Sequence, residues 1–345
     1  MKFSRLLLLS SVFVAVALSG CKKDDDETSL YFNGTIRLPL ESYVEAGYSK
    51  TFCVDTLVNV SLQDGSKEGI GYAYKLPLAT KRDTIKTASG DFKTKNFTVV
   101  APDSLSTFST VLSAFADGYY ENSASSSFTV VSPGLNGKRT TLSGYDIKDT
   151  DKTFTDGRDG AEYYYSEQSG LQWMRQNLSW NGSGMTYDCC SSPAVGTIFG
   201  RYYTWNQAQT ACPEGWRLPT EKEWVDLAAS FGCEASEGSD IHGFAGKAME
   251  NIYFNRTRMW EYWRDVKIDN AAGLSAAPFG YAMVDEDSFQ FAGFGKYAVF
   301  WTSSEDDGLG VYRYIFGEKD ILFYGTSDKD YFAASVRCVR EVPTL

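Results

Sequence analysis

The chain has 345 residues and carries 44 Asp and Glu against 33 Lys and Arg, which gives a net charge of −11 at pH 7. That length suggests about two domains, and the negative charge excludes nucleic acid as a partner because it repels a phosphate backbone. The aromatic content of 15% is led by 22 Tyr and 22 Phe, and it favours β-rich, surface-exposed modules over helical bundles.

Residues 1–20 have the pattern of a secretory signal peptide. Lys2 and Arg5 give a positive start, and residues 6–18 form an apolar run that is too short for a membrane span. The run ends in Leu-Ser-Gly-Cys21, which resembles the lipobox of bacterial lipoproteins and implies that Cys21 is lipidated and becomes the first mature residue. The alternative is an ordinary signal peptide followed by an incidental cysteine. Cleavage would remove Lys2 and Arg5 and change the net charge from −11 to −13.

Residues 21–29 are predicted to form a lipidated, acidic tether. The run KKDDDE at residues 22–27 has no apolar side chain and therefore cannot pack into a core. An acidic cluster directly after a lipidated cysteine resembles the export signal of surface-displayed outer-membrane lipoproteins, and a flexible spacer is the alternative. The resemblance implies an outer-membrane lipid anchor through Cys21, with the rest of the protein exposed at the cell surface.

Residues 30–133 are predicted to form an all-β, immunoglobulin-like sandwich. Apolar residues alternate with a period of two in several short segments that are separated by turn residues. The alternating residues are Val58, Val60 and Leu62; Tyr72, Tyr74 and Leu76; Phe97 and Val99; Phe108, Thr110, Leu112 and Ala114; and Phe128 and Val130. The pattern resembles bacterial immunoglobulin-like modules that serve as spacers. Cys53 is predicted to be a buried, reduced thiol.

A run that contains proline and glycine at residues 132–137 is interpreted as the domain boundary. Beyond it lies an acidic stretch with Asp149, Asp151, Asp156 and Asp159. This stretch does not fit the EF-hand pattern, because Phe154 and Gly160 occupy the positions that need Gly and Glu. We therefore predict a solvated turn instead of a calcium site.

Strands at residues 163–165 and 171–178 are expected to open the second domain, and two helices should follow. Thr204 with Gln207, and Thr220 with Glu223, each fit the pattern in which a hydroxyl caps a helix start and a residue three further on reaches back. The second helix should end before Gly232, where a left-handed cap is expected. Its apolar stripe consists of Trp224, Leu227, Ala228 and Phe231.

Cys212 follows the first predicted helix in a proline-rich segment. Near the C-terminus, Val336 and Cys338 alternate onto one face of a predicted strand, so that Cys338 can point inward at the end of that helix. Our hypothesis is a disulfide between Cys212 and Cys338. The five cysteines of this domain also allow Cys189 or Cys190 to pair with Cys233, which leaves one over and the connectivity open.

Five motifs occur along residues 140–345: FGRYYTWNQAQTACPEGWRLPTEKEW at 199–224, AGKAM at 245–249, GLSAAPFGY at 273–281, FWTSSE at 300–305 and SVRCVRE at 335–341. In this order they resemble the Fibrobacter succinogenes major paralogous domain, which is similar in turn to the C-type lectin-like fold. The resemblance implies an α+β C-type lectin-like domain over residues 140–345. It implies much less about function, because one fold hosts many activities.

Enzymatic chemistry is not predicted. His242 is the one histidine and is interpreted as a surface loop residue, which argues against a nucleophile activated by histidine. The RLPTEKEW segment also resembles formylglycine-generating oxidases. Those enzymes need two reactive cysteines near the C-terminus, whereas Cys338 alone follows Cys233 here. The sequence therefore predicts no catalytic residue and no cofactor.

The C-type lectins that bind sugars through calcium use motifs with asparagine and aspartate on a late strand, where this chain reads FWTSS at residues 300–304. We therefore expect binding without calcium or another metal. Trp260, Tyr262 and Trp263 are predicted to stand on a long loop, where they stack on a sugar or anchor a protein. The alternative is that most of these aromatic side chains fill the core.

These expectations combine into a surface-anchored, non-enzymatic binding or adhesion lipoprotein. Its lectin-like domain would present a calcium-independent site to glycan or protein ligands. The alternatives are a structural or tip subunit of a surface fibre, and an enzyme related to the formylglycine-generating oxidases.

Overall fold

The computed structural model describes residues 29–90, 92–132, 142–143, 148, 151–182, 193–254, 256–285 and 288–343. The predicted signal peptide, Cys21 and the acidic run at 22–27 lie outside the described residues, as do Asp149, Cys189, Cys190 and most of the predicted boundary. Within the described ranges, no helix is both long enough and apolar enough to cross a membrane.

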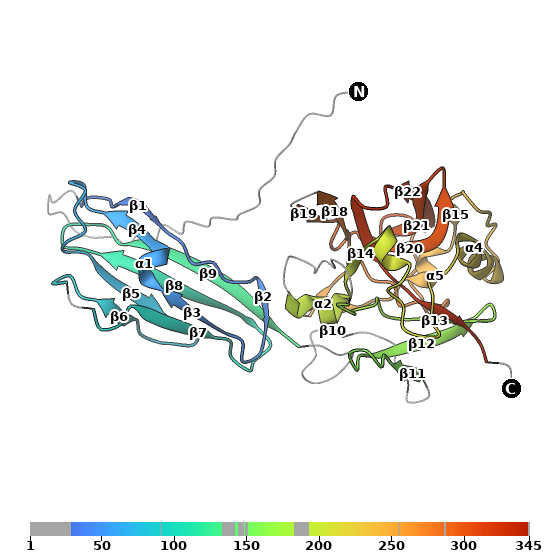
Figure 1. The fold of residues 1–345 in the computed structure, drawn as a ribbon, viewed down its shortest axis with the longest axis horizontal. Coiled ribbons are helices and arrows are strands. Elements are labelled where there is room, and N and C mark those ends of the chain that lie inside the picture. The colour runs from blue at the N-terminus through green and yellow to red at the C-terminus, as the bar shows by residue number, and fades with distance from the viewer. Residues whose placement is uncertain are drawn as a thin grey trace, which may run out of the picture.

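Residues 29–132, here called the N-terminal part, contain strands β1 to β9 and one short helix, at one end of the ribbon in Figure 1. The bounds are β1 (Asn33–Ile36), β2 (Tyr43–Glu45), β3 (Ser49–Cys53), α1 (Val54–Leu57), β4 (Val58–Ser61), β5 (Gly71–Lys75), β6 (Asp83–Lys86), β7 (Asn96–Val100), β8 (Thr107–Phe115) and β9 (Asn122–Val131). A five-stranded sheet has the order β2-β9-β8-β5-β6, and β1-β4 and β3-β7 form antiparallel pairs. Only β2 and β9 run parallel within the five-stranded sheet of the described residues.

The all-β prediction for this part is confirmed. The five segments with alternating apolar residues lie in β4, β5, β7, β8 and β9 or extend one residue beyond them. Their inward residues, such as Val60, Phe97, Leu112 and Val130, are buried in one apolar cluster. The prediction of strands from alternating apolar residues succeeded because successive side chains of a strand point to opposite faces, so that one face of each strand is apolar.

Residues 142–343, here called the C-terminal part, contain the remaining elements. Their bounds are β10 (Leu142–Ser143), β11 (Lys152–Thr155), β12 (Glu162–Gln168), β13 (Leu171–Met174), α2 (Pro193–Phe199), β14 (Tyr202–Thr204), α3 (Trp205–Ala208), α4 (Glu221–Ser230), β15 (Ile241–His242), α5 (Ala245–Ala248), β16 (Tyr253–Phe254), β17 (Thr257–Arg258), β18 (Tyr281–Asp285), β19 (Ser288–Ala292), β20 (Tyr297–Asp306), β21 (Leu309–Phe316), β22 (Ile321–Ser327), β23 (Phe332–Ser335) and β24 (Val339–Glu341). The largest sheet has the order β15-β22-β21-β20-β23-β18-β19, with β14 paired to β23. The smaller sheets are β11-β12-β13-β24 and β10-β16-β17.

Both predicted capping boxes are present. In α3 and α4 the side chain of the capping threonine, Thr204 or Thr220, accepts a hydrogen bond from the backbone three residues on, and the side chain there returns one. Gly232 ends α4 with a φ of 78°, and the N–H groups of Gly232 and Cys233 donate to Ala229 and Ala228. This is a Schellman motif, in which glycine avoids the strain of a left-handed backbone.

Helix α4 covers one face of the large sheet with its predicted apolar stripe. Trp224, Leu227 and Ala228 are buried in the cluster that includes Phe300 of β20, and Phe231 packs against that cluster. Helix α4 does not pack on the opposite face of the same sheet.

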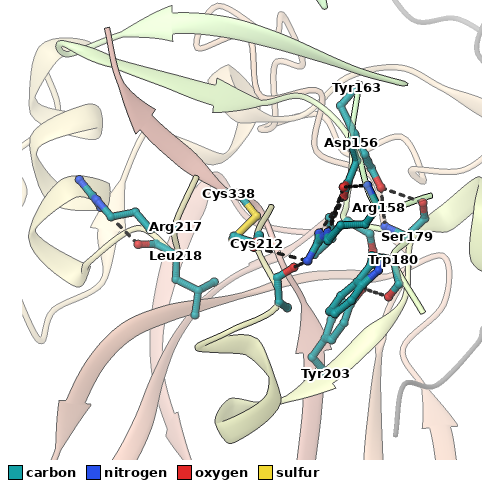
Figure 2. The surroundings of a disulfide bond; sticks show 12 residues. Asp156, Arg158, Tyr163, Ser179, Trp180, Tyr203, Cys212, Arg217, Leu218 and Cys338 are labelled. Atoms are coloured by element: carbon teal, nitrogen blue, oxygen red, sulfur yellow. Dashed lines mark hydrogen bonds and ion pairs between the residues drawn. A yellow bond between two sulfur atoms is a disulfide. The ribbon is translucent and has the colours of Figure 1, made fainter. Parts of the chain in front are cut away.

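The predicted disulfide between Cys212 and Cys338 is formed, with the two Cα atoms 5.9 Å apart, and Figure 2 shows its surroundings. It joins the turn after α3 to the residue directly before β24. Val336 and Cys338 are buried as alternation predicts, but Arg337 between them is buried too. The Arg337 guanidinium donates to the carbonyls of Met174 and Leu274, which explains how a charged side chain is held in the interior.

The prediction of a solvated acidic turn is wrong for Asp156, which is buried. Its carboxylate accepts hydrogen bonds from the guanidinium and backbone N–H of Arg158, whose Nη1 also donates to the Ala211 carbonyl at 2.8 Å (Figure 2). Burial alone would raise the pKa of the Asp156 carboxyl, but the Arg158 hydrogen bonds and charge lower it below its ordinary value. The pair thus fastens the β11–β12 turn beside the disulfide.

Two free thiols are described. Cys233 is partly buried and unpaired, so the bridge to Cys189 or Cys190 that the cysteine count allowed is not formed. Cys53 is free as predicted, although it is only half-buried at the end of β3.

The N-terminal and C-terminal parts meet through apolar side chains. The ring of Tyr43 in β2 lies 5.6 Å from the ring of Phe254, and Val131 at the end of β9 is buried in one cluster with Phe199 and Ile252. Apolar packing therefore joins the two parts on either side of residues 133–141.

Candidate functional site

The predicted aromatic loop is only partly available to a ligand. The prediction that Trp260 binds a ligand is wrong. Its side chain is 1% exposed, and its Nε1 donates to the Ala276 carbonyl at 3.0 Å within the core. An indole that fills the interior cannot contact a ligand. Tyr262 and Trp263 are 75% and 37% exposed, and their role as ligand-binding residues stays a prediction.

A shallow aromatic groove lies on the large sheet, on the face that α4 does not cover. We call it the tyrosine groove. Its volume is about 360 Å³, and its lining residues are Tyr281, Met283, Tyr297, Val299, Tyr312, Tyr314, Ser327 and Phe332. These residues come from β18, β20, β21, β22 and β23, so five strands of one sheet build the site.

The alternation of β21 explains why tyrosines face the groove. Val311, Arg313 and Ile315 are buried, whereas Tyr312 and Tyr314 between them are partly exposed. In β20 the same period sends Phe300 into the core below and Tyr297 and Val299 to the groove.

Strand register brings the aromatic rings together. Tyr314 pairs with Val299 on one side and with Phe323 on the other, and its ring stacks on that of Phe323 at 4.8 Å. Tyr297 lies 6.0 Å from Tyr281 and 6.3 Å from Tyr314, measured between ring centroids. The rings therefore form one connected floor, not a set of isolated side chains.

Gly325 is needed where the Tyr312 ring crosses β22. A Cβ at position 325 would lie 2.5 Å from Cζ of Tyr312, and the hydroxyl oxygen would be 2.8 Å away. Any other residue would force the ring to move. The glycine in β22 thus allows the Tyr312 ring to lie against the strand and its hydroxyl to reach the groove.

The tyrosine hydroxyls of the groove are unused by the protein. Within the described ranges, no protein group hydrogen-bonds to the hydroxyl of Tyr281, Tyr297, Tyr312 or Tyr314. Their oxygens are not fully buried either, so they are open to a ligand or to water. Each hydroxyl can donate one hydrogen bond and accept others.

The groove is also uncharged. Among the described residues, its lining contains no Asp, Glu, Lys or Arg. Burial raises the pKa values of Tyr281, Tyr312 and Tyr314. Nearby tyrosine hydroxyls raise those of Tyr281 and Tyr312 further, and the pKa of Tyr314 is raised next by the Asp240 carboxylate, outside the groove lining, and then by Tyr297. These phenols therefore stay protonated and neutral at neutral pH. Ring faces bordered by neutral hydroxyls can cover the apolar face of a polar molecule while exchanging hydrogen bonds with its edge.

Three larger cavities of the C-terminal part are less suited to a neutral ligand, and the smallest of them, of about 410 Å³, is lined by the paired Asp156 and Arg158 and by Arg340, whose guanidinium lies over the Trp216 ring. Of the remaining two, one, of about 790 Å³, is lined by Arg158, Tyr163 and Trp180, but Arg158 pairs with Asp156 and stacks on Trp180 at 3.8 Å, and the Tyr163 hydroxyl bonds to Ser179. The other, of about 760 Å³, lies beside Cys233. Burial raises the pKa of that thiol, which disfavours the reactive thiolate.

No metal centre is described. Within the described ranges, no three His, Cys, Asp or Glu side chains are grouped closely enough to hold a metal ion. Two hydroxyls of the FWTSS stretch, which sequence analysis compared with calcium-dependent lectins, are already engaged. Oγ1 of Thr302 donates to the Val311 carbonyl, and Oγ of Ser304 accepts from the Glu221 N–H. His242 is exposed at the end of β15.

Sequence analysis assigned no ligand-binding role to the four groove tyrosines, Tyr281, Tyr297, Tyr312 and Tyr314. A usable signal was present in VYRYIF at residues 311–316, where aromatic residues recur at every second position. That spacing places them on one face of a strand. The spacing does not show which face of the strand helix α4 covers. Because α4 packs on the face that carries Phe300, the tyrosines on the other face stay partly exposed.

The motifs that carry the family resemblance contact one another, and Tyr281 is the one motif residue in the groove lining. Arg217 of RLPTEKEW bonds to Glu223 and to Glu341 of the last motif. Trp224 lies 5.6 Å from Phe300 of FWTSSE in a stacked arrangement. The motifs therefore hold the scaffold together, and the residues that face the groove lie largely outside them.

Comparison with known proteins confirms the family resemblance of these motifs. The family model described as the Fibrobacter succinogenes major domain matches residues 167–340. No curated protein and no solved structure matches the chain. Because the family match spans half of the sequence, the protein belongs to the Fibrobacter succinogenes major domain family.

Proposed function

We propose that this protein is a surface-anchored, non-enzymatic binding lipoprotein that takes up a neutral glycan, without calcium, in the tyrosine groove. The observation that carries the proposal is the set of four partly exposed tyrosines whose hydroxyls have no partner among the described residues. Sugar rings present an apolar face and an edge of hydroxyls, and the groove offers the complement of both.

Charge favours a neutral ligand. The uncharged lining gives no salt bridge to a sulfated or carboxylated glycan, and the net charge of −11 repels acidic polymers at long range. A protein ligand would also accept tyrosine anchors, but tyrosine-rich protein interfaces usually carry charged or polar side chains at the rim. The groove itself supplies only hydroxyls.

The proposed architecture is an immunoglobulin-like spacer that presents a C-type lectin-like domain. The all-β N-terminal part with its five-stranded sheet supports the first assignment. The second is supported by helix α4 on one face of a mixed sheet and by the disulfide between the α3 segment and the last strand. Neither assignment is needed for the groove itself.

A binding role fits the chemistry better than catalysis. Cys338 is bonded to Cys212 and is therefore not a free thiol for an oxidase of the formylglycine-generating kind. Among the residues that the structure describes, the groove lining contains no carboxylate, histidine or cysteine to move a proton or attack a substrate.

A glycan array with the full-length protein in detergent tests the function. We expect binding to uncharged glycans that is unchanged by a chelator and unchanged between pH 6 and 8, because burial raises the pKa values of Tyr281, Tyr312 and Tyr314 further above that range. A pull-down from host surface extracts is run in parallel. Loss of binding on chelation, or binding only in the protein pull-down, would contradict the proposal.

Substitutions in the groove should separate the rings from the hydroxyls. Tyr297→Ala removes a ring from the floor and should weaken glycan binding on the order of thirtyfold, as expected for an anchor worth about 2 kcal/mol. Tyr297→Phe keeps the ring and should cost only about fivefold, the value of one hydrogen bond near 1 kcal/mol.

The matched control is Tyr324→Phe. The Tyr324 hydroxyl already bonds to Asp306 at 2.9 Å, and Tyr324 lies on the other face of β22 from Phe323. Its variant should bind the array glycans like the wild type. Equal losses in Tyr297→Phe and Tyr324→Phe, or no loss in Tyr297→Ala with an unchanged thermal transition, would place the ligand elsewhere.

The membrane anchor is proposed from the sequence alone. Incorporation of a labelled lipid precursor should be lost in Cys21→Ala, because the thiol is the predicted acylation site. Protease added to intact cells should degrade the wild-type protein. A protein that is labelled but protected from protease would be a lipoprotein that faces the periplasm.

A further inference from the structure

We infer that the binding surface continues from the tyrosine groove across Phe316 to a second subsite at Trp263, so that the ligand is a linear, neutral glycan chain and not a single sugar. This inference rests on the proposed function of the groove. It assigns to Trp263 a role in selecting chain length.

Phe316 connects the two subsites. It continues the outward series of β21 after Tyr312 and Tyr314, and it pairs directly with Tyr297 across the sheet. The Tyr297 and Phe316 rings stack with centroids 4.8 Å apart and planes 16° apart. The aromatic floor therefore reaches the end of β21 without a break.

Phe316 also lines a small pocket of about 10 Å³ together with Trp263, so a ligand would contact the rings at its rim and would not fill it. Its other lining residues are Glu261, Gly295, Lys296, Gly317 and Glu318. One ring, that of Phe316, is thus shared between the stack on Tyr297 and the pocket at Trp263. A chain that lies on the groove would pass from the Phe316 ring across this pocket to the indole.

The backbone of Trp263 is held in place, but its indole N–H has no hydrogen-bond acceptor among the described residues. Trp260, three residues earlier, is anchored in the core by its hydrogen bond to Ala276, and the Trp263 carbonyl accepts from the Val266 N–H at 3.2 Å. The Trp263 side chain is 37% exposed, and no described protein group accepts a hydrogen bond from its indole N–H. An indole with a fixed backbone loses little entropy when it stacks on a ligand.

The second subsite differs from the groove in its polar groups. Lys296, Glu261 and Glu318 surround the indole, and both charge signs are present. Ammonium and carboxylate groups can exchange hydrogen bonds with sugar hydroxyls, and charge-assisted bonds are the stronger kind. Because positive and negative side chains are both present, the second subsite does not select for an ionic ligand.

The test is a size ladder of linear, uncharged oligosaccharides of the cello-, xylo-, manno- and malto- series, from two units upward, titrated against the full-length protein. Affinity should rise with chain length and then level off for the series that binds. Trp263→Ala should remove that rise, about fivefold for an aromatic contact near 1 kcal/mol, and leave the affinity for the shortest bound member unchanged. Trp263→Phe, which keeps a ring, should retain part of the rise.

Tyr253→Ala is the matched control, because Tyr253 is 38% exposed and lines neither subsite. It should leave the whole ladder unchanged. If the shortest member binds as tightly as the longest and Trp263→Ala alters neither, the groove function stands and the second subsite is wrong. If no series binds and Tyr297→Ala binds the array glycans like the wild type, the proposed function itself has failed.

Discussion

Replacing Cys212 and Cys338 together by alanine should lower the free energy of unfolding of the C-terminal part by about 5 kcal/mol. The two cysteines are 126 residues apart in the sequence, and a bridge that closes so long a loop removes much entropy from the unfolded chain. At the usual entropy of unfolding for a domain of this size, the melting temperature should fall by about 10–20 °C.

Calorimetry of the double variant under non-reducing conditions measures this effect. Cys233→Ala is the matched control, since Cys233 is a free, partly buried thiol of the same part and closes no loop. The control should melt close to the wild type. A double variant that also melts there would show that the bridge constrains the unfolded chain far less than its span implies.

Breaking the ion pair between Arg313 and Glu221 should cost about 3–5 kcal/mol of unfolding free energy, as found for buried pairs that lose one partner. Both side chains are buried, with Arg313 0% exposed. The Arg313 guanidinium donates twice to the Glu221 carboxylate, once from Nε at 2.9 Å, and Nη1 donates to the Ser239 carbonyl at 2.7 Å. Arg313→Met would leave the carboxylate buried without a cation.

Chemical denaturation of Arg313→Met and of the double variant Arg313→Met with Glu221→Met tests the pair. The double variant should lose less stability than the single one, because no charge is left buried. Lys222→Met is the control on the same helix, since its pair with Asp226 is exposed and should not matter measurably. Equal losses in the single and double variants would mean that packing, not charge, explains the effect.

The same ion pair bears on the proposed glycan binding. Arg313 lies in β21 between Tyr312 and Tyr314, so the bond to Glu221 fixes the strand that carries two groove tyrosines. The alternation that sends Arg313 inward sends both rings outward. The buried pair therefore positions the groove, and glycan binding should weaken in Arg313→Met even below its melting temperature.

Local patterns in the sequence determined much of the fold. The capping boxes at Thr204 and Thr220 and the left-handed cap at Gly232 involve residues at most five positions apart, so each can be read from a short stretch. Strand alternation in the N-terminal part is equally local. The bridge between Cys212 and Cys338 was also correctly predicted, because the alternation of Val336 and Cys338 indicated an inward thiol.

Tertiary structure alone decided which aromatic residues are available to a ligand. Trp260 and Trp263 are three residues apart in one loop, yet one is fastened to Ala276 in the core and the other remains partly exposed. Asp156 looks like any loop aspartate in the sequence, but it is held by Arg158, which also donates to the distant Ala211 carbonyl. The tyrosine groove collects residues from Tyr281 to Phe332 on five strands, and its exposure depends on which face α4 covers. Sequence patterns report the period of one strand, whereas burial of a face is set by distant elements that pack against it.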